Sequence, residues 1–148
     1  VRAMAEIAEA AEEAPEIHGR AHGIVQDTPA AAIMHAAVQL ADEIDAAAVV
    51  IPTKTGGAAR ACAKYRPGRP LVALANDDGV AEQLALEWGT YATRMADVDS
   101  VDDLIDTALV TTREFAGLAP GALVIITAGR AGMAGGTNLI MVREVPGD

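Results

Sequence analysis

The feature that most constrains the fold is a pair of short, uninterrupted apolar runs, residues 46–52 and 70–75, each followed by a helical pattern. A strand that is apolar at every position is typical of a parallel sheet covered on both faces. Further strands are expected at residues 90–95, 122–127 and 139–145. The pattern predicts an α/β three-layer sandwich with a mostly parallel five-stranded sheet and an antiparallel final strand.

Helical periodicity fills most of the remaining chain. A first helix over residues 3–14 is expected to stop at Pro15, which cannot continue it. The next helix is expected to begin at Pro29, with Asp27 or Thr28 as its N-cap, and to run to about Asp45. Three more helices are expected at residues 58–65, 80–88 (closed by Gly89 as a C-terminal cap) and 100–115.

Composition narrows the class of protein. The chain has 148 residues, which fits one domain, and only 3% of them are aromatic, so small aliphatic side chains must build the core. A net charge of −10 argues against a nucleic-acid partner, which would require clustered Lys and Arg. No apolar run approaches the ~20 residues of a membrane-spanning helix, so no membrane partner is expected and the cytoplasm is the expected location.

A turn at residues 53–57, Thr-Lys-Thr-Gly-Gly, follows the first buried run and precedes a helix. It combines two hydroxyl groups, the charge of Lys54 and glycines that let an anion approach backbone N–H groups. Arg60, one turn into the helix, is a further candidate cation. The segment matches neither the Walker pattern nor G-x-G-x-x-G, so phosphate binding and a purely structural turn both stay open on local grounds.

A second glycine-rich loop, residues 128–138, includes Arg130 and Gly135 and strengthens the phosphate interpretation. Catalytic signatures are missing, and His35 and Cys62 are interpreted as packing residues because neither has a partner at a useful spacing. The acidic cluster at residues 97–106 fits a capped, solvated helix start better than a metal site. We therefore expect no catalytic residue, no metal and no cofactor in this chain.

Four segments together resemble the C-terminal domain of pyruvate kinase over nearly the whole chain. They are VRAMAEIAEAAE, TKTGGAARACAKYRPGRPLVALA, QLALEWGTY and GGTNLIMVREV. The resemblance implies that residues 1–16 are the terminal helix of a junction with a preceding catalytic barrel, and that residues 17–148 form the C-terminal α/β domain. The absence of an initiator Met agrees with a fragment of a longer chain.

The family transfers phosphate from phosphoenolpyruvate to ADP in the barrel, with Mg²⁺ and K⁺, so this fragment is expected to be inactive alone. Its C-terminal domain binds a phosphorylated effector and joins subunits into a homotetramer. By resemblance, the effector-phosphate residues are Thr53, Lys54, Thr55, Gly56, Gly57, Arg130 and Gly135.

The second loop reads Gly-Arg-Ala-Gly-Met where members activated by fructose 1,6-bisphosphate have Trp-Arg-Pro-Gly-Ser, so AMP or a sugar phosphate is the expected effector. Ala58 replaces a hydroxyl residue of many members. Two alternatives therefore remain, namely a structural assembly domain without an effector and a free-standing phosphate-ligand-binding protein.

Overall fold

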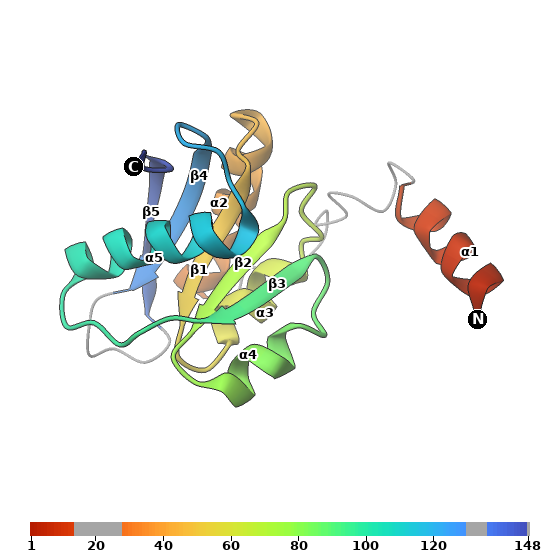
Figure 1. The fold of residues 1–148 in the computed structure, drawn as a ribbon, viewed down its shortest axis with the longest axis horizontal. Coiled ribbons are helices and arrows are strands. Elements are labelled where there is room, and N and C mark those ends of the chain that lie inside the picture. Colours follow the sequence, from red (N-terminus) through yellow and green to blue (C-terminus); the bar gives the residue numbers. More distant parts are fainter. Residues whose placement is uncertain (14–27, 130–135, 148) are drawn as a thin grey trace.

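The computed structural model describes residues 1–13, 28–129 and 136–147, which form five helices and five strands (Figure 1). The elements are α1 (Arg2–Glu12), α2 (Pro29–Glu43), β1 (Ala48–Thr53), α3 (Gly57–Ala63), β2 (Leu71–Ala75), α4 (Asp78–Leu84), β3 (Thr90–Arg94), α5 (Val101–Ala116), β4 (Leu123–Gly129) and β5 (Thr137–Glu144). In this part of the chain no helix is both long and apolar enough to cross a membrane.

The five strands form a single sheet in the order β3-β2-β1-β4-β5. Strands β1 to β4 are parallel, with Val49 paired to Leu71 on one side and to Ile125 on the other. Strand β5 is antiparallel to β4 and forms one edge of the sheet. The predicted mostly parallel sheet with an antiparallel last strand is confirmed.

Helices cover both faces of this sheet, which explains the uninterrupted apolar runs. On one face, α2 and α3 pack against side chains such as Val49 and Ile51, and Leu84 of α4 joins the same cluster. On the opposite face, α5 packs against the alternate residues, Val50 among them (Figure 1). Successive side chains of a strand point to opposite faces, so a central strand must be apolar throughout to fill both clusters.

Helix α1 stands apart from this sandwich (Figure 1), and every one of its residues is exposed, including Met4 and Ile7. Its apolar side chains have the helical spacing that the sequence predicts, but no partner among the described residues buries them. Residues 14–27 lie outside the described residues, so the predicted boundary between residues 16 and 17 stays a prediction.

The predicted end of the fourth helix was wrong. Helix α4 ends at Leu84 rather than near Trp88, and Gly89 (φ +57°) shapes the turn into β3 instead of capping the helix. Beyond Leu84 the backbone changes to three-residue turns, in which the N–H of Glu87 bonds to the carbonyl of Leu84 at 3.0 Å. This tighter winding brings the carbonyl of Gly89 to the N–H of Leu71 at 2.9 Å and starts the β2–β3 pairing.

Candidate functional site

The turn at residues 53–57 is closed by its own first side chain. The Oγ1 of Thr53, at the end of β1, accepts the N–H of Gly56 at 3.0 Å. Gly56 has φ +79°, and a Cβ there would lie 3.0 Å from both the Arg60 guanidinium and the Leu84 side chain. Glycine is therefore needed at position 56 for backbone conformation and for space. These contacts hold the turn in a defined shape where α3 begins.

The two cations near this turn have different environments. Lys54 is exposed, and no ion pair or hydrogen bond of its side chain occurs among the described residues. Arg60 instead donates to the carbonyl of Thr55 at 3.0 Å and to Gln83 at 3.1 Å, and it pairs with Glu87 at 3.3 Å. Arg60 thus braces the turn against α4, and the expectation that it supplies free charge to an anion is not supported by these contacts.

A cleft of about 600 Å³ runs along the carboxyl ends of the parallel strands. Thr53, Lys54 and Thr55 line it at the end of β1 and just beyond, Asn76 lines it after β2, and Gly129 lines it at the end of β4. Because β2 and β4 lie on opposite sides of β1, the connections diverge there and leave a crevice. In open α/β sheets such a crevice is the usual place for a ligand.

The second predicted loop meets this cleft through its ends. Gly129 and Gly136 line the cleft, and a Cβ on Gly129 would lie 2.6 Å from the backbone oxygen of Gly136. The close approach of two backbones therefore requires glycine at position 129. Residues 130–135 lie outside the described residues, so the roles predicted for Arg130 and Gly135 stay predictions.

Two cleft residues were not among the predicted site residues. Asn76 follows β2, and Asp97, three residues after β3, accepts a hydrogen bond from the Asn76 side chain at 2.5 Å. Sequence reasoning placed Asp97 in the solvated acidic cluster. The signal that could have found both is their position directly after predicted parallel strands, whose carboxyl ends share one edge of the sheet.

This arrangement agrees with comparisons to known proteins. A family model described as pyruvate kinase, alpha/beta domain, matches residues 31–143, which covers the sheet, its covering helices and the cleft. The chain belongs to the pyruvate kinase α/β domain family. The match includes the turn at residues 53–57, and the predicted resemblance to the C-terminal domain of pyruvate kinase is confirmed.

Curated relatives are bacterial pyruvate kinases. The chain is 36% identical to pyruvate kinase of Bacillus licheniformis over 82% of its own length and 20% of the relative's. It is 36% identical to pyruvate kinase 2 of Synechocystis sp. over 98% of its length and 24% of the relative's. It is 32% identical to pyruvate kinase of Staphylococcus haemolyticus over 98% of its length and 25% of the relative's. The chain thus spans about a fifth to a quarter of the relatives that it matches.

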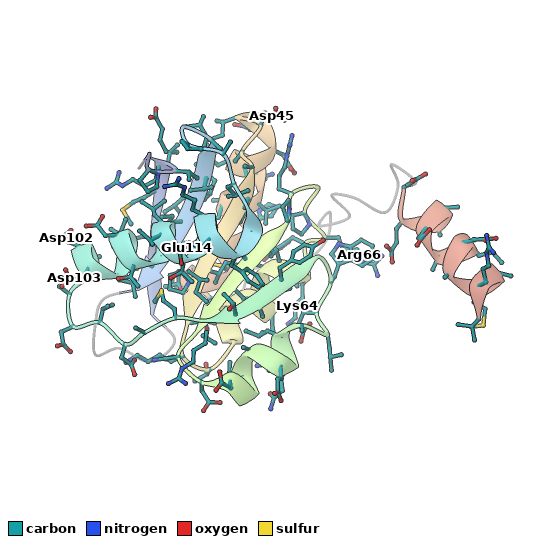
Figure 2. All side chains as sticks on the ribbon, in the orientation of Figure 1. Asp45, Lys64, Arg66, Asp102, Asp103 and Glu114 are labelled. Atoms are coloured by element: carbon teal, nitrogen blue, oxygen red, sulfur yellow. The ribbon has the colours of Figure 1, made fainter. Side chains whose placement is uncertain are left out.

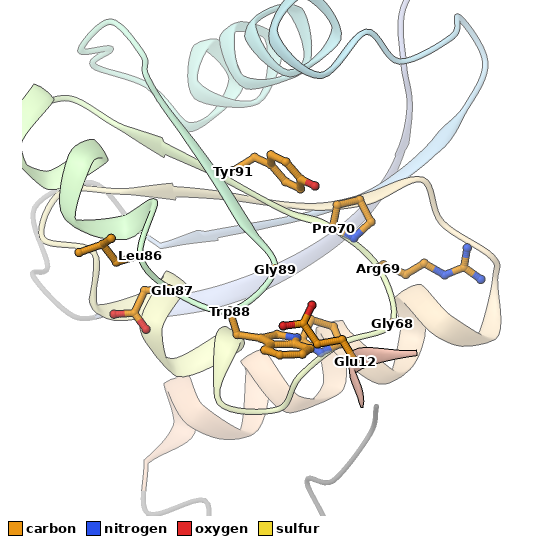
Figure 3. A pocket seen from close by; sticks show the side chains of 10 residues that line it. Glu12, Gly68, Arg69, Pro70, Leu86, Glu87, Trp88, Gly89 and Tyr91 are labelled. Atoms are coloured by element: carbon orange, nitrogen blue, oxygen red, sulfur yellow. The ribbon is translucent and has the colours of Figure 1, made fainter. Parts of the chain in front are cut away.

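This pyruvate kinase α/β domain has another hollow, of about 560 Å³, at the amino ends of β2 and β3 (Figure 3). Figure 3 shows Arg69 at its rim and Trp88 and Tyr91 within it. Arg69 is paired with Asp42 and Asp45, and Trp88 lies under Arg66 at 4.6 Å, so these cations are already engaged. Trp88 also packs against the core, in the turn between α4 and β3.

The remaining candidates in the pyruvate kinase domain are packing residues. His35 lies against the buried Tyr65 ring, with centroids 4.9 Å apart. Cys62 is fully buried, and burial raises the pKa of its thiol to about 12, so it is not a nucleophile near neutral pH. No group of three metal-ligating side chains occurs in the described ranges, and Ser100 caps the acidic start of α5.

Proposed function

We propose that this chain is the C-terminal regulatory and oligomerisation domain of a pyruvate kinase, and that it binds a phosphorylated effector at the turn of residues 53–57. The observation that carries the proposal is the exposed Lys54 beside this turn, at one wall of a cleft of about 600 Å³. Since no carboxylate of the described residues pairs with it, the Lys54 charge is available to an anion. The domain is not catalytic alone.

The turn supports an anion in two further ways. Thr53 and Thr55 bring hydroxyl groups to the same wall, and Gly57, an exposed residue without a side chain, also lines the cleft. Arg60 holds the Thr55 carbonyl, which fixes the turn before a ligand arrives. A pre-shaped anion site loses less conformational entropy on binding than a loop that must first become ordered. Arg130 and Gly135 of the second loop would complete the phosphate site.

In the whole protein, we propose, this domain accompanies a barrel that transfers phosphate from phosphoenolpyruvate to ADP with Mg²⁺ and K⁺ in the cytoplasm. The support is that the relatives are pyruvate kinases and are four to five times longer than the matched region. An effector would act on the barrel through differential affinity for two states of the assembled protein. AMP and sugar phosphates are the proposed effector classes.

Self-association with other pyruvate kinase subunits is the second part of the proposal. Strand β5 lies at the edge of the sheet (Figure 1) and exposes Leu139 and Val142 to 38% and 41%. Unpaired backbone groups with apolar side chains on an edge strand favour contact with another chain. Sedimentation of the purified chain at increasing concentration tests this part.

Calorimetric titration tests the effector site directly. The 148-residue chain would be titrated with AMP, ribose 5-phosphate, glucose 6-phosphate and fructose 1,6-bisphosphate. Lys54→Ala should weaken whichever binding appears by tenfold or more, because a charge-assisted hydrogen bond contributes about 1.5–3 kcal/mol.

The matched control is Lys64→Ala, which removes the same charge from an exposed position at the other end of α3. It should leave the affinity within twofold of the wild type. Equal losses in both variants would place the effect in overall charge rather than at the turn, and binding that survives Lys54→Ala would place the site elsewhere.

One observation favours a structural assembly domain without an effector. Ala58, which lines the cleft, has no hydroxyl to donate to a phosphate. Under this alternative all four titrations would give no heat while the chain still self-associates. A free-standing phosphate-binding protein is the remaining alternative, and a gene that encodes a barrel upstream of Val1 would exclude it.

A further inference from the structure

The cleft has two chemically different ends. Its Lys54 end is formed by the turn of residues 53–57. The opposite end, which we call the Asp97 end, has apolar side chains of Leu74, Met95 and Leu104 and polar groups of Asn76, Asp97 and Ser100. The two ends follow β1 and β3, which are separated by β2, so roughly 10 Å lies between them at 4.7–4.9 Å per strand. One small molecule can therefore contact both ends.

The charges at the two ends are opposite. Of the described residues that line the cleft, Lys54 is the one cation and Asp97 the one carboxylate. The Asp97 carboxylate is positioned by Asn76, whose side-chain N–H bonds to it at 2.5 Å. Its second oxygen has no hydrogen bond among the described residues, so it can accept one from a ligand.

The start of α5 does not offset the charge of Asp97. A helix N-terminus normally favours an anion, and Ser100 and Val101 of this start line the cleft. Here Ser100 already accepts the N–H of Asp103 at 3.0 Å and donates to the Asp103 carboxylate at 2.6 Å. Asp102 adds a second carboxylate in the same turn, and Figure 2 shows both acids at this end of α5. A phosphate placed here would meet acidic side chains.

We infer that the cleft selects a monophosphate whose far end is neutral and carries hydroxyl groups, and that Asp97 is the residue that sets this specificity. The inference rests on the proposed function, since the phosphate occupies the Lys54 end. At the other end Asp97 accepts hydrogen bonds from hydroxyl groups, as a sugar or ribose supplies, while the apolar residues cover the carbon skeleton. A second phosphate is repelled by the same carboxylate.

The test compares ligands that differ by one phosphate. Calorimetry would be run at one low ionic strength with glucose 6-phosphate against glucose 1,6-bisphosphate, and with AMP against adenosine 3′,5′-bisphosphate, because salt screens exposed charges. In the pair that binds, the wild-type chain should prefer the monophosphate by at least tenfold. Asp97→Asn keeps the acceptor for Asn76 and removes the charge, so the preference should fall at least threefold. Asp97→Lys should reverse it.

The matched control is Asp99→Asn, an equal charge change at an exposed residue that does not line the cleft. It should leave the preference unchanged. A wild-type preference below tenfold, or an effect of Asp97→Asn no larger than that of Asp99→Asn, overturns the inference and leaves the proposed effector site standing. If neither these four ligands nor ribose 5-phosphate and fructose 1,6-bisphosphate bind the wild-type chain, the proposed function fails and the inference fails with it.

Discussion

Lys54 and Arg60 carry the same charge near the same turn but contribute differently to it. The Arg60 side chain is held by Thr55, Gln83 and Glu87, whereas Lys54 extends from the turn without a described partner. Partly exposed ion pairs such as Arg60–Glu87 contribute little to stability, typically about 0–1 kcal/mol. The role of Arg60 is therefore to position the turn, and the role proposed for Lys54 is to bind.

Gly56 is the residue of the turn most sensitive to substitution. Gly56→Ala should lower the free energy of unfolding by about 1–2 kcal/mol, because a Cβ is strained at φ +79° and meets Leu84 at 3.0 Å. Gly57→Ala is the control, since its Cβ would lie 3.6 Å from the nearest described neighbour, within the helix. Urea unfolding measures both. Equal midpoints for the two variants would show that the turn tolerates a side chain at position 56.

Cys62 makes stability depend on pH in the alkaline range. Burial raises the pKa of its thiol from 9.0 to about 12, so between these values the unfolded chain loses a proton that the folded chain keeps. The contribution is fully present below pH 9 and is lost as pH rises toward 12, by about 1.4 kcal/mol per pH unit. Urea unfolding at pH 8 and at about pH 10.5 would compare the wild type with Cys62→Ala.

Over that pH range the wild type should lose roughly 2 kcal/mol more than Cys62→Ala, because the variant has no thiol to ionise. The comparison between chains cancels the titration of Tyr and Lys side chains, which both chains share. A loss of equal size in the two chains would mean that water reaches Cys62 and that its thiol ionises normally.

Among the strands, the central ones were predictable because burial on both faces leaves an apolar run, as in β1 and β2. Helix starts were predictable where a cap is local, as at Thr28 and Ser100, whose hydroxyl oxygens accept N–H groups three residues on. The end of α4 was not, because pairing between β2 and β3 draws the chain out of the helix at Leu84.

In the candidate site, too, features set by neighbouring residues were predictable and contacts between distant residues were not. The turn of residues 53–57 could be identified from adjacent residues, since its glycines, hydroxyl groups and lysine are contiguous. The Asn76–Asp97 contact joins residues 21 apart and depends on β2 lying beside β3. The sequence could place both residues at the carboxyl ends of parallel strands, but strand order follows from packing of the whole sheet, so their contact could not be predicted.

In the molecule as a whole, two hollows lie at opposite ends of the strands. The cleft with the 53–57 turn is at the carboxyl ends of the strands, and the hollow with Gly68 and Gly89 is at the amino ends of β2 and β3. The cleft contains a described cation without a partner, whereas the cations of the other hollow are paired or lie on Trp88. A phosphorylated ligand is therefore expected at the cleft and not at the other hollow.

Nuclear magnetic resonance of the ¹⁵N-labelled chain distinguishes the two sites, because glycine amides at both hollows report in one spectrum. Titration with AMP, and separately with glucose 6-phosphate, should shift the amides of Gly56 and Gly57 saturably for at least one ligand. The amides of Gly68 and Gly89, in the other hollow, should stay within the spread of unaffected residues. Saturable shifts at Gly68 and Gly89 with none at Gly56 and Gly57 would show that the ligand binds the other hollow and not the cleft.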